Sequence, residues 1–215
     1  KEDNIAKYEE IMRRDIGIYV LKASKDKGSS YDIAKVMFEM YKDSFVCVSA
    51  KDNMWYYFNE KNGGKWEITE VGHKLRSRLS SDIVDLYFVY SKKYQDKSNI
   101  EEEDSEFKNI YDNRVANCSK IIDKLKDSGY KDKIMKECKE YFYDDEFIEK
   151  LDDQKHLVGF ENGIYDLNKG IFRGGLPSDY VSLSTEIKLP IPKEMMPMKI
   201  NDIIDISKEM ENYNE

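Results

Sequence analysis

The sequence contains few cysteines and histidines, and these few do not form a metal-binding pattern. The three cysteines, Cys47, Cys118 and Cys138, are far apart and include no C-x-x-C pair. Only His73 and His156 are available as histidine ligands to complete a site. We therefore expect no zinc site. An odd number of widely spaced thiols is typical of reduced cysteines in an intracellular protein.

Long apolar runs are absent as well. No stretch approaches the ~20 apolar residues that span a bilayer, so we expect no membrane partner. The first residues do not have the pattern of a signal peptide. The chain starts at Lys1 and ends in a polar helical pattern, which predicts that it is a piece of a longer protein.

An excess of positive charge is also lacking. The chain has 35 Lys and Arg residues against 43 Asp and Glu residues, a formal net charge of -8. This balance argues against a protein that coats nucleic acid by charge alone, although it is compatible with a local basic face. Hydrophobic residues make up 40% of the chain and aromatic residues 13%, which is ample for a folded core.

Apolar spacing divides the first part of the chain into helices and a small sheet. Intervals of three and four residues predict a helix over residues 4–15 and a second one that starts at Ser30 as its cap. Residues 45–68 are predicted to form an aromatic β meander of three strands. Its turns are expected at residues 51–53 and 62–64.

Residues 69–151 carry a helical pattern. One long apolar stripe is predicted from Leu75, Leu79, Ile83, Leu86 and Val89 or Tyr90. A later helix is expected to end at Ser128-Gly129, and the next one to begin near Asp132. The acidic run at residues 101–104 is expected to be a solvated loop or a helix start.

Residues 157–185, LVGFENGIYDLNKGIFRGGLPSDYVSLST, predict a second β unit. Its apolar runs are separated by turn residues at Asn162-Gly163 and at residues 168–170, which indicates two short strands folded back on each other. The prolines after residue 189 predict a linker and the start of a connecting helix over residues 190–215. The fold class predicted is α+β, mainly helical with two small antiparallel β units.

The glycines of this β unit do not form a phosphate loop. Gly170 and Gly175 have the spacing of the first half of G-x-x-x-x-G-K-[ST]. Leu176 and Pro177 then stand where the lysine and the hydroxyl residue would be required. Turn geometry explains these glycines, and no ATP site is predicted in the chain.

The acidic residues do not predict catalysis. Asp144-Asp145-Glu146 and Asp152-Asp153 lie at expected helix ends, where carboxylates face water. Asp166 and Asp179 lie beside turns and are expected to bind local backbone N–H groups. The sequence therefore predicts no catalytic, cofactor-binding or metal-binding residue.

Nucleic-acid binding is the function that the residues themselves favour most. Lys74, Arg76 and Arg78 place three cations within two helical turns. Flat aromatic faces on the neighbouring sheet are offered by Trp55, Tyr56, Tyr57 and Trp66. Single-strand binders combine a cationic groove with such stacking surfaces. For these particular residues, however, the favoured interpretation is ordinary packing, in which the cations only surround a buried helix and the aromatic rings belong to the core.

The order of residues in 157–185 is more particular than its fold. F-x-N-G-x-Y-D-L, a turn, F-R and then P-x-D-Y-V-S-L-S-T resembles the N-terminal helper domain, of the "D-five N" type, of viral and phage primase–helicases. The aromatic hairpin around Trp55 and the strand around Trp66 also lie where that family has them. The high content of Lys, Asn, Ile, Asp and Tyr is what an A·T-rich genome of a giant or other large DNA virus would encode.

The resemblance implies a helper domain over residues 1–189, placed directly before a superfamily 3 helicase motor. ATP and Mg²⁺ are then expected in that downstream motor rather than in this chain. The implied partners are the downstream ATPase domain, further copies in a hexamer, and DNA, and the implied location is the host cytoplasm or a viral replication site. The alternative is a free-standing protein-interaction domain without a role in replication.

Overall fold

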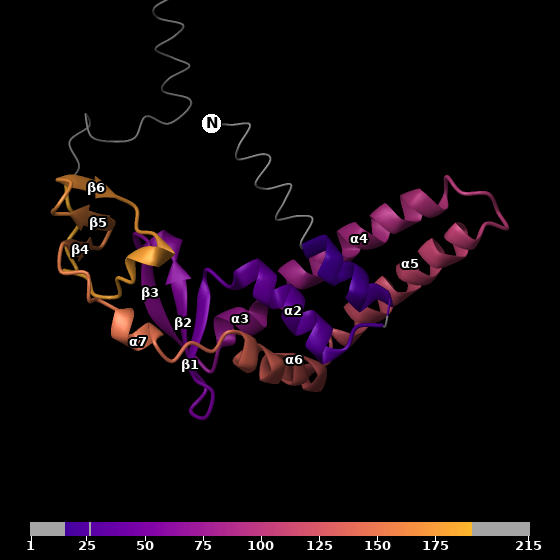
Figure 1. Cartoon of the computed structure of the whole chain (residues 1–215), viewed down its shortest axis with the longest axis horizontal. Helices are drawn as coiled ribbons and strands as arrows, with labels where there is room; N and C mark the ends of the chain where they lie inside the picture. The colour runs from indigo at the N-terminus through magenta and orange to yellow at the C-terminus, as the bar shows by residue number, and fades with distance from the viewer. Residues whose placement is uncertain (1–15, 26, 191–215) are drawn as a thin grey trace, which may run out of the picture.

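The structure is a computed structural model that describes residues 16–25 and 27–190 (Figure 1). The predicted helix over residues 4–15 and the connecting segment after residue 190 lie outside the described residues. Residues 16–25 are helical. The elements that follow are α2 (Ser30–Tyr41), β1 (Phe45–Ser49), β2 (Met54–Asn59), the short helix η1 (Glu60–Asn62), β3 (Lys65–Glu70), α3 (His73–Arg78), α4 (Asp82–Ser98), α5 (Glu106–Lys124), α6 (Ser128–Tyr141), α7 (Phe147–Lys150), β4 (Leu157–Phe160), β5 (Gly163–Asp166), β6 (Ile171–Arg173) and the short helix η2 (Pro177–Asp179).

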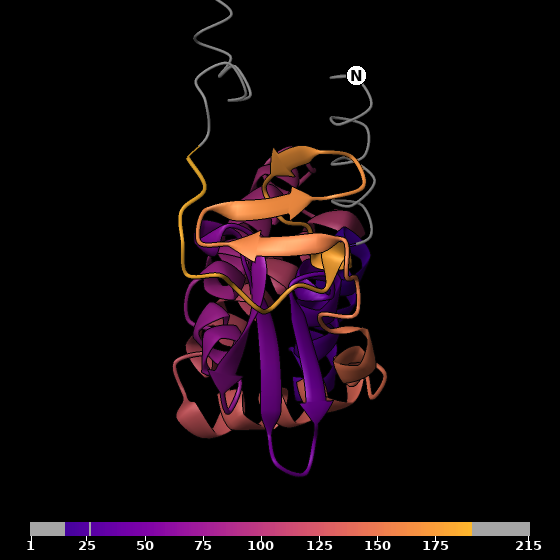
Figure 2. The ribbon, with the colours of Figure 1, turned by 90° about the vertical axis from the view of Figure 1, so that its left-hand side faces the viewer.

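Helices and two separate antiparallel sheets make up the described chain, so the predicted α+β class is confirmed. The sheets have the strand orders β1-β2-β3 and β4-β5-β6. Figure 2 shows β4, β5 and β6 running across the direction of β1, β2 and β3. The second β unit thus has three strands, one more than the sequence indicated, because the turn at residues 168–170 is followed by a further paired strand.

Two predicted helix boundaries are wrong, and in each case a nearby side chain caps the helix better. Helix α2 is capped by Ser29 rather than Ser30, since the Ser29 hydroxyl accepts the Asp32 N–H at 3.1 Å. Residues Ser128 and Gly129 begin α6 instead of ending α5. The Asp127 carboxylate accepts the Tyr130 N–H at 2.6 Å and starts that helix earlier than expected.

The apolar stripe predicted from Leu75 to Val89 or Tyr90 faces the main core, although a break divides it between two helices. Helix α3 ends at Arg78 and α4 begins at Asp82. The predicted positions Leu75, Leu79 and Ile83 are fully buried, and Leu86 and Tyr90 pack against the same core. Of the two alternatives for the last position, Tyr90 therefore holds, since Val89 is 49% exposed.

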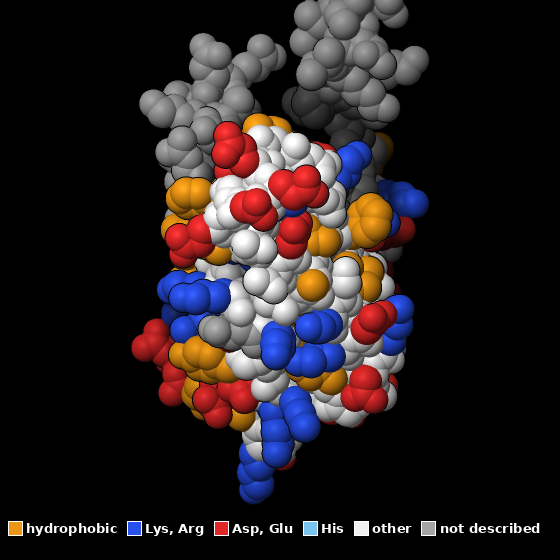
Figure 3. Space-filling view, turned by 90° about the vertical axis from the view of Figure 1, so that its right-hand side faces the viewer, with side chains coloured by type: hydrophobic (Ala, Val, Ile, Leu, Met, Phe, Trp, Pro, Cys, Tyr) orange, Lys and Arg blue, Asp and Glu red, His pale blue; other side chains and the backbone are white. Residues whose placement is uncertain are grey.

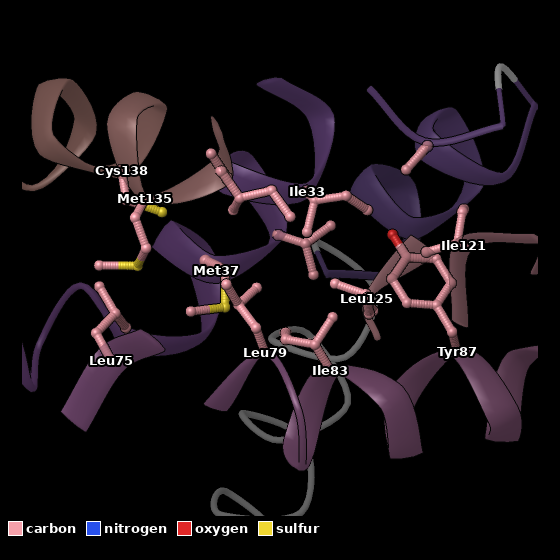
Figure 4. Close-up of a cluster of buried hydrophobic side chains, with 14 of the residues drawn as sticks. Ile33, Met37, Leu75, Leu79, Ile83, Tyr87, Ile121, Leu125, Met135 and Cys138 are labelled. Carbon is pink, nitrogen blue, oxygen red and sulfur yellow. The ribbon is translucent and has the colours of Figure 1, made fainter. Parts of the chain in front are cut away.

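The main core lies between the helices and one face of the first sheet (Figure 4). Side chains of α2, α3, α4, α5 and α6 point toward one another there. The labelled members include Ile33, Met37, Leu79, Ile83 and Ile121, all fully buried. This core makes a helical body to which the first sheet is attached.

A smaller apolar cluster on the opposite face of the first sheet joins it to the second β unit. Phe58, Trp66 and Phe147 are its buried members. The rings of Trp66 and Phe147 meet at 4.9 Å between centroids, in an edge-to-face arrangement. The backbone N–H of Trp66 donates to the Val181 carbonyl at 2.8 Å, so the chain after η2 runs beside β3.

Lys65 forms a buried hydrogen bond between the two sheets. Its side chain is almost fully buried, and Nζ donates to the Phe160 carbonyl at 2.6 Å. Burial lowers the pKa of this ammonium group below its ordinary value. Beside it, Gly175 donates its N–H to the Gly63 carbonyl at 3.0 Å. A Cβ atom on Gly175 would lie 1.9 Å from the Gly64 carbonyl oxygen, so only glycine permits this approach.

Two of the predicted structural carboxylates hold turns of the second β unit, as expected. Asp166 accepts the backbone N–H groups of residues 168 and 169, both at 3.1 Å. Asp179 accepts the Leu176 N–H at 2.7 Å and forms a two-pronged ion pair with Arg173. Burial opposes the charge of Asp179, but Arg173 and the Leu176 N–H outweigh it and hold the pKa of this carboxyl below its ordinary value.

Asp152 differs from its predicted solvated role. Its carboxylate accepts the Ser182 N–H at 2.7 Å and the Leu183 N–H at 3.1 Å. The Ser182 hydroxyl donates to the second oxygen of the same carboxylate at 2.5 Å. These bonds join residues that are 30 positions apart. Helix-end statistics could not indicate a contact over such a distance along the chain.

Residues 16–25 and 27–190 contain neither a membrane-spanning helix nor a metal-binding cluster. None of the described helices combines the length and the apolar character needed to cross a bilayer. The same residues contain no group of three or more His, Cys, Asp or Glu side chains placed to hold a metal ion.

Candidate nucleic-acid interface

A cleft of roughly 440 Å³ lies where the end of α2, the first two strands, η1 and α3 meet. Aromatic and cationic side chains line most of it. They include Tyr41, Phe45, Tyr57, Lys61, Lys74 and Arg78. The first three come from α2, β1 and β2, and the last two come from α3.

The aromatic side of the cleft is a row of three rings. Tyr41 and Phe45 meet edge to face with 5.9 Å between their centroids. Phe45 and Tyr57 are stacked at 6.2 Å with 29° between their planes. Phe45 is buried while the two tyrosines are partly exposed, so the tyrosines are the rings that a ligand in the cleft can reach.

Two of the three cations that line the cleft lie one helical turn apart, and the third is Lys61 of η1. Lys74 and Arg78 are four positions apart on α3 and therefore share a face. The Lys74 Nζ lies 5.4 Å from the centroid of the Tyr57 ring, and the Arg78 Cζ lies 5.9 Å from that of the Tyr41 ring. Each of these two cations is thus paired with one accessible ring.

Arg78 also contacts Asp82 at 3.1 Å, with both side chains substantially exposed. Exposed pairs of this kind contribute about 0–1 kcal/mol. Exchanging the carboxylate for a phosphate oxygen therefore costs little. The Tyr41 hydroxyl donates to Asp82 at 2.6 Å, which keeps the carboxylate in place beside the cleft.

Hydrogen bonds fix the orientation of Tyr57. Its hydroxyl donates to Glu67 at 2.5 Å, and the side-chain amides of Asn59 and Asn62 donate to the same carboxylate at 3.0 and 2.6 Å. Burial, reinforced by Glu67, raises the pKa of Tyr57 to about 12. Burial opposes the charge of Glu67, but these three donors lower the pKa of its carboxyl overall. At neutral pH the tyrosine therefore stays protonated and its ring stays aligned along the cleft.

Arg76, the third predicted cation, lies elsewhere. Its guanidinium contacts the Asp132 carboxylate at 2.9 Å and the Ser128 hydroxyl at 2.9 Å. These contacts tie α3 to α6. The structure thus brings Lys74 and Arg78 together and assigns Arg76 to packing between helices.

The two predicted tryptophans do not line the cleft. Trp55 is 0% exposed and Trp66 is 3% exposed. The Trp55 indole N–H donates to Asn53 at 3.0 Å, and that of Trp66 donates to the Pro177 carbonyl at 2.9 Å. Buried rings cannot stack on a base. The two tryptophans therefore belong to the core, as the packing interpretation predicts.

Sequence reasoning included Tyr57 among the aromatic faces but missed Tyr41 and Lys61. Tyr41 belongs to the apolar face of α2 by its spacing, and Lys61 lies next to a glycine turn. Only the fold of residues 41–78 places them beside Lys74 and Arg78. The contact of these cations with DNA remains a prediction.

Comparison with known proteins identifies the class of this chain. Residues 34–205 match the family described as "D5 N terminal like". The chain belongs to this family, and the resemblance seen in its sequence is confirmed.

Its curated relatives include viral proteins named "Putative helicase". The L207/L206 protein of Acanthamoeba polyphaga mimivirus is 34% identical over 75% of this chain and 16% of its own length. The 022R protein of Frog virus 3 is 28% identical over 80% of this chain and 21% of its own length. The 121R protein of Invertebrate iridescent virus 3 is 26% identical, over 73% and 18%. The chain spans about a fifth or less of the length of these relatives.

Proposed function

We propose that this module is the non-catalytic N-terminal accessory part of a viral replicative helicase and that it guides single-stranded DNA through its aromatic and cationic cleft. The motor is then a downstream superfamily 3 ATPase, which binds ATP and Mg²⁺ and works as a hexameric ring that this module helps to assemble. The site of action is the host cytoplasm or a viral replication site. Family membership and the names of the relatives support the helicase context.

One observation carries the DNA part of the proposal: Lys74 and Arg78 lie next to the accessible rings of Tyr57 and Tyr41 in one cleft. Phosphates of a single strand would contact the cations, and bases would stack on the rings. Stacking on an aromatic side chain contributes about 1–3 kcal/mol for each base and does not depend on sequence. A guide for DNA passing into a motor needs this tolerance of any sequence.

The number of cations predicts a shallow salt dependence. Lys61, Lys74 and Arg78 line the cleft, so about three phosphates can be neutralised. For single strands, the logarithm of the binding constant falls with the logarithm of salt with a slope of about −0.7 for each phosphate. We expect a slope of about −2.

Fluorescence anisotropy with a labelled single-stranded oligonucleotide tests the proposal. Replacing Lys74 and Arg78 together by alanine is expected to weaken binding at least tenfold and to reduce the salt slope. Tyr57→Ala is expected to weaken binding at constant slope, because it removes a ring and no charge. Arg76→Ala is the matched control: it removes a cation of the same short helix that does not line the cleft.

Three results would contradict DNA contact at the cleft. One is the absence of binding at low salt. Another is wild-type affinity in the Lys74→Ala/Arg78→Ala variant. The last is an equal loss of affinity in the Arg76→Ala variant, since binding would then depend on total charge and not on the position of the cations in the cleft. Thermal unfolding of each variant verifies that the fold is retained.

The helicase context has a separate test in the longer reading frame. A G-x-x-x-x-G-K-[ST] motif between a strand and a helix after Glu215 supports an ATPase motor. A reading frame that continues without such a motif favours the free-standing interaction domain instead.

A further inference from the structure

The loop between α4 and α5 forms an exposed projection that combines acidic and apolar side chains. Figure 1 shows this loop at the far end of the two long helices. Glu102, Glu103 and Asp104 are exposed there. Ile100 is 85% exposed and Phe107 is 61% exposed, so the loop presents apolar side chains beside its carboxylates. We name residues 100–107 the acidic knob.

Figure 3 looks at the molecule from the end where this loop projects. Red carboxylate side chains lie in the upper part of that view, above a group of blue basic side chains, and further red side chains lie lower down on both sides.

A groove of opposite character lies between helical residues 16–25 and α5. Its volume is roughly 550 Å³. Leu21 and Ile110 are 36% and 37% exposed and supply its apolar surface. Lys22, Lys25 and Arg114 supply its charge. We name this surface the basic groove.

Asn117 closes one side of the basic groove. Its side-chain amide donates to the Ser24 carbonyl at 2.8 Å and thereby holds α5 against the helix of residues 16–25. Arg114 is held over the Tyr94 ring, with its Cζ 5.4 Å from the ring centroid. The groove is thus a built surface with fixed walls rather than a gap between mobile side chains.

The knob and the groove are complementary in both charge and apolar character. Carboxylates beside Ile100 and Phe107 match ammonium and guanidinium groups beside Leu21 and Ile110. A chain cannot insert its knob into its own groove, because Phe107 and Ile110 lie one turn apart on the same helix. The knob that fits this groove must come from another molecule, and a second copy of the chain carries one.

We propose that the acidic knob of one copy docks in the basic groove of a second copy. The contact is heterologous, since two different surfaces meet, and such contacts repeat from one subunit to the next as in a ring. This contact would supply an interface between subunits of the ring, and the inference therefore rests on the ring assembly in the proposed function. The DNA cleft is a separate surface, so failure of this contact leaves the DNA proposal unaffected.

Light scattering over a wide range of protein concentration measures the contact. We expect the mass of the wild-type chain to rise above that of a monomer, and to do so less at high salt. Glu102→Lys with Glu103→Lys reverses the knob, and Lys22→Glu with Lys25→Glu reverses the groove. Each reversed variant alone is expected to associate at least tenfold more weakly. Lys51→Glu, in the turn after β1, is the matched control and is expected to associate like the wild type.

Mixing the two reversed variants gives the decisive result. A reversed knob then faces a reversed groove, so an equimolar mixture is expected to associate again while each component alone does not. A mixture that stays monomeric, with both variants folded by circular dichroism, overturns the proposal. So does a wild-type chain that stays monomeric at all concentrations, or a Lys51→Glu variant that loses association equally.

Discussion

Removing the hydroxyl of Tyr87 is expected to stabilise the protein. The side chain is fully buried in the main core, and its hydroxyl has no hydrogen-bond partner within the described part of the chain. Figure 4 shows this hydroxyl among the apolar side chains around Ile33 and Ile121. Burial raises the pKa of Tyr87 well above its ordinary value.

The size of the effect follows from two opposing contributions. A buried donor left without a partner costs about 1–3 kcal/mol. Tyr87→Phe removes this cost and leaves a void of one oxygen atom, which forfeits a few contacts of about 0.1–0.2 kcal/mol each. The net gain in the free energy of unfolding is about 1 kcal/mol, which corresponds to a rise in Tm of about 2–4 °C for a chain of this size.

Thermal and urea unfolding followed by circular dichroism measure this gain. Tyr130→Phe is the matched control, because the Tyr130 hydroxyl donates to the Gly28 carbonyl at 3.1 Å. The same chemical change should there cost about 0.5–1.5 kcal/mol. If Tyr87→Phe instead lowers stability as much as Tyr130→Phe does, the hydroxyl has a partner, such as a buried water, and the reasoning is refuted.

Three further predictions concern the second β unit and its join to the first sheet. Lys65→Met is expected to lower the free energy of unfolding by about 1–3 kcal/mol, because the Phe160 carbonyl loses its donor; urea unfolding measures it, and an unchanged midpoint would contradict the buried bond. Gly175→Ala is expected to unfold at a lower temperature, since its Cβ collides with the Gly64 carbonyl; a Tm equal to the wild type would show that the sheets can move apart. Asp179→Asn addresses pH. The pKa of this carboxyl is lowered in the fold, so its stabilisation is present above its unfolded pKa of about 3.9 and lost as the pH falls below it. The variant should be less stable at neutral pH and should lose less stability below about pH 4, and parallel pH curves would contradict the ion pair.

Elements with a strong local pattern could be predicted from the sequence. The predicted meander of residues 45–68 is confirmed, because its aromatic strands are separated by short turns that favour antiparallel pairing of neighbouring strands. The turn roles of Asp166 and Asp179 followed from the same local chemistry. Their partners lie within three residues for these backbone bonds, which a sequence pattern can indicate.

Contacts between distant residues could not be predicted in this way. The role of Lys65 is one example, since no residue near it in the sequence indicates that it bonds the carbonyl of residue 160. Lys74, Arg76 and Arg78 looked equivalent, because alternate positions on a short helix differ only through what packs against them. The cleft exists because Tyr41 arrives from another helix, and this depends on the whole fold.

The segment after η2 determines how a mechanical load enters the molecule. Residues 185–189 are held to the second sheet by the Thr185 N–H to the Gly159 carbonyl, the Glu161 N–H to the Ile187 carbonyl, and a pair of bonds between Leu189 and Asn162. A pull on residue 190 is therefore borne first by these few bonds. From there it reaches the first sheet through the Lys65 bond to the Phe160 carbonyl and the Trp66 backbone bond to Val181. It also reaches the chain after α7 through the bonds of Asp152 to Ser182 and Leu183. The second sheet is therefore the first part of the described fold to bear such a load.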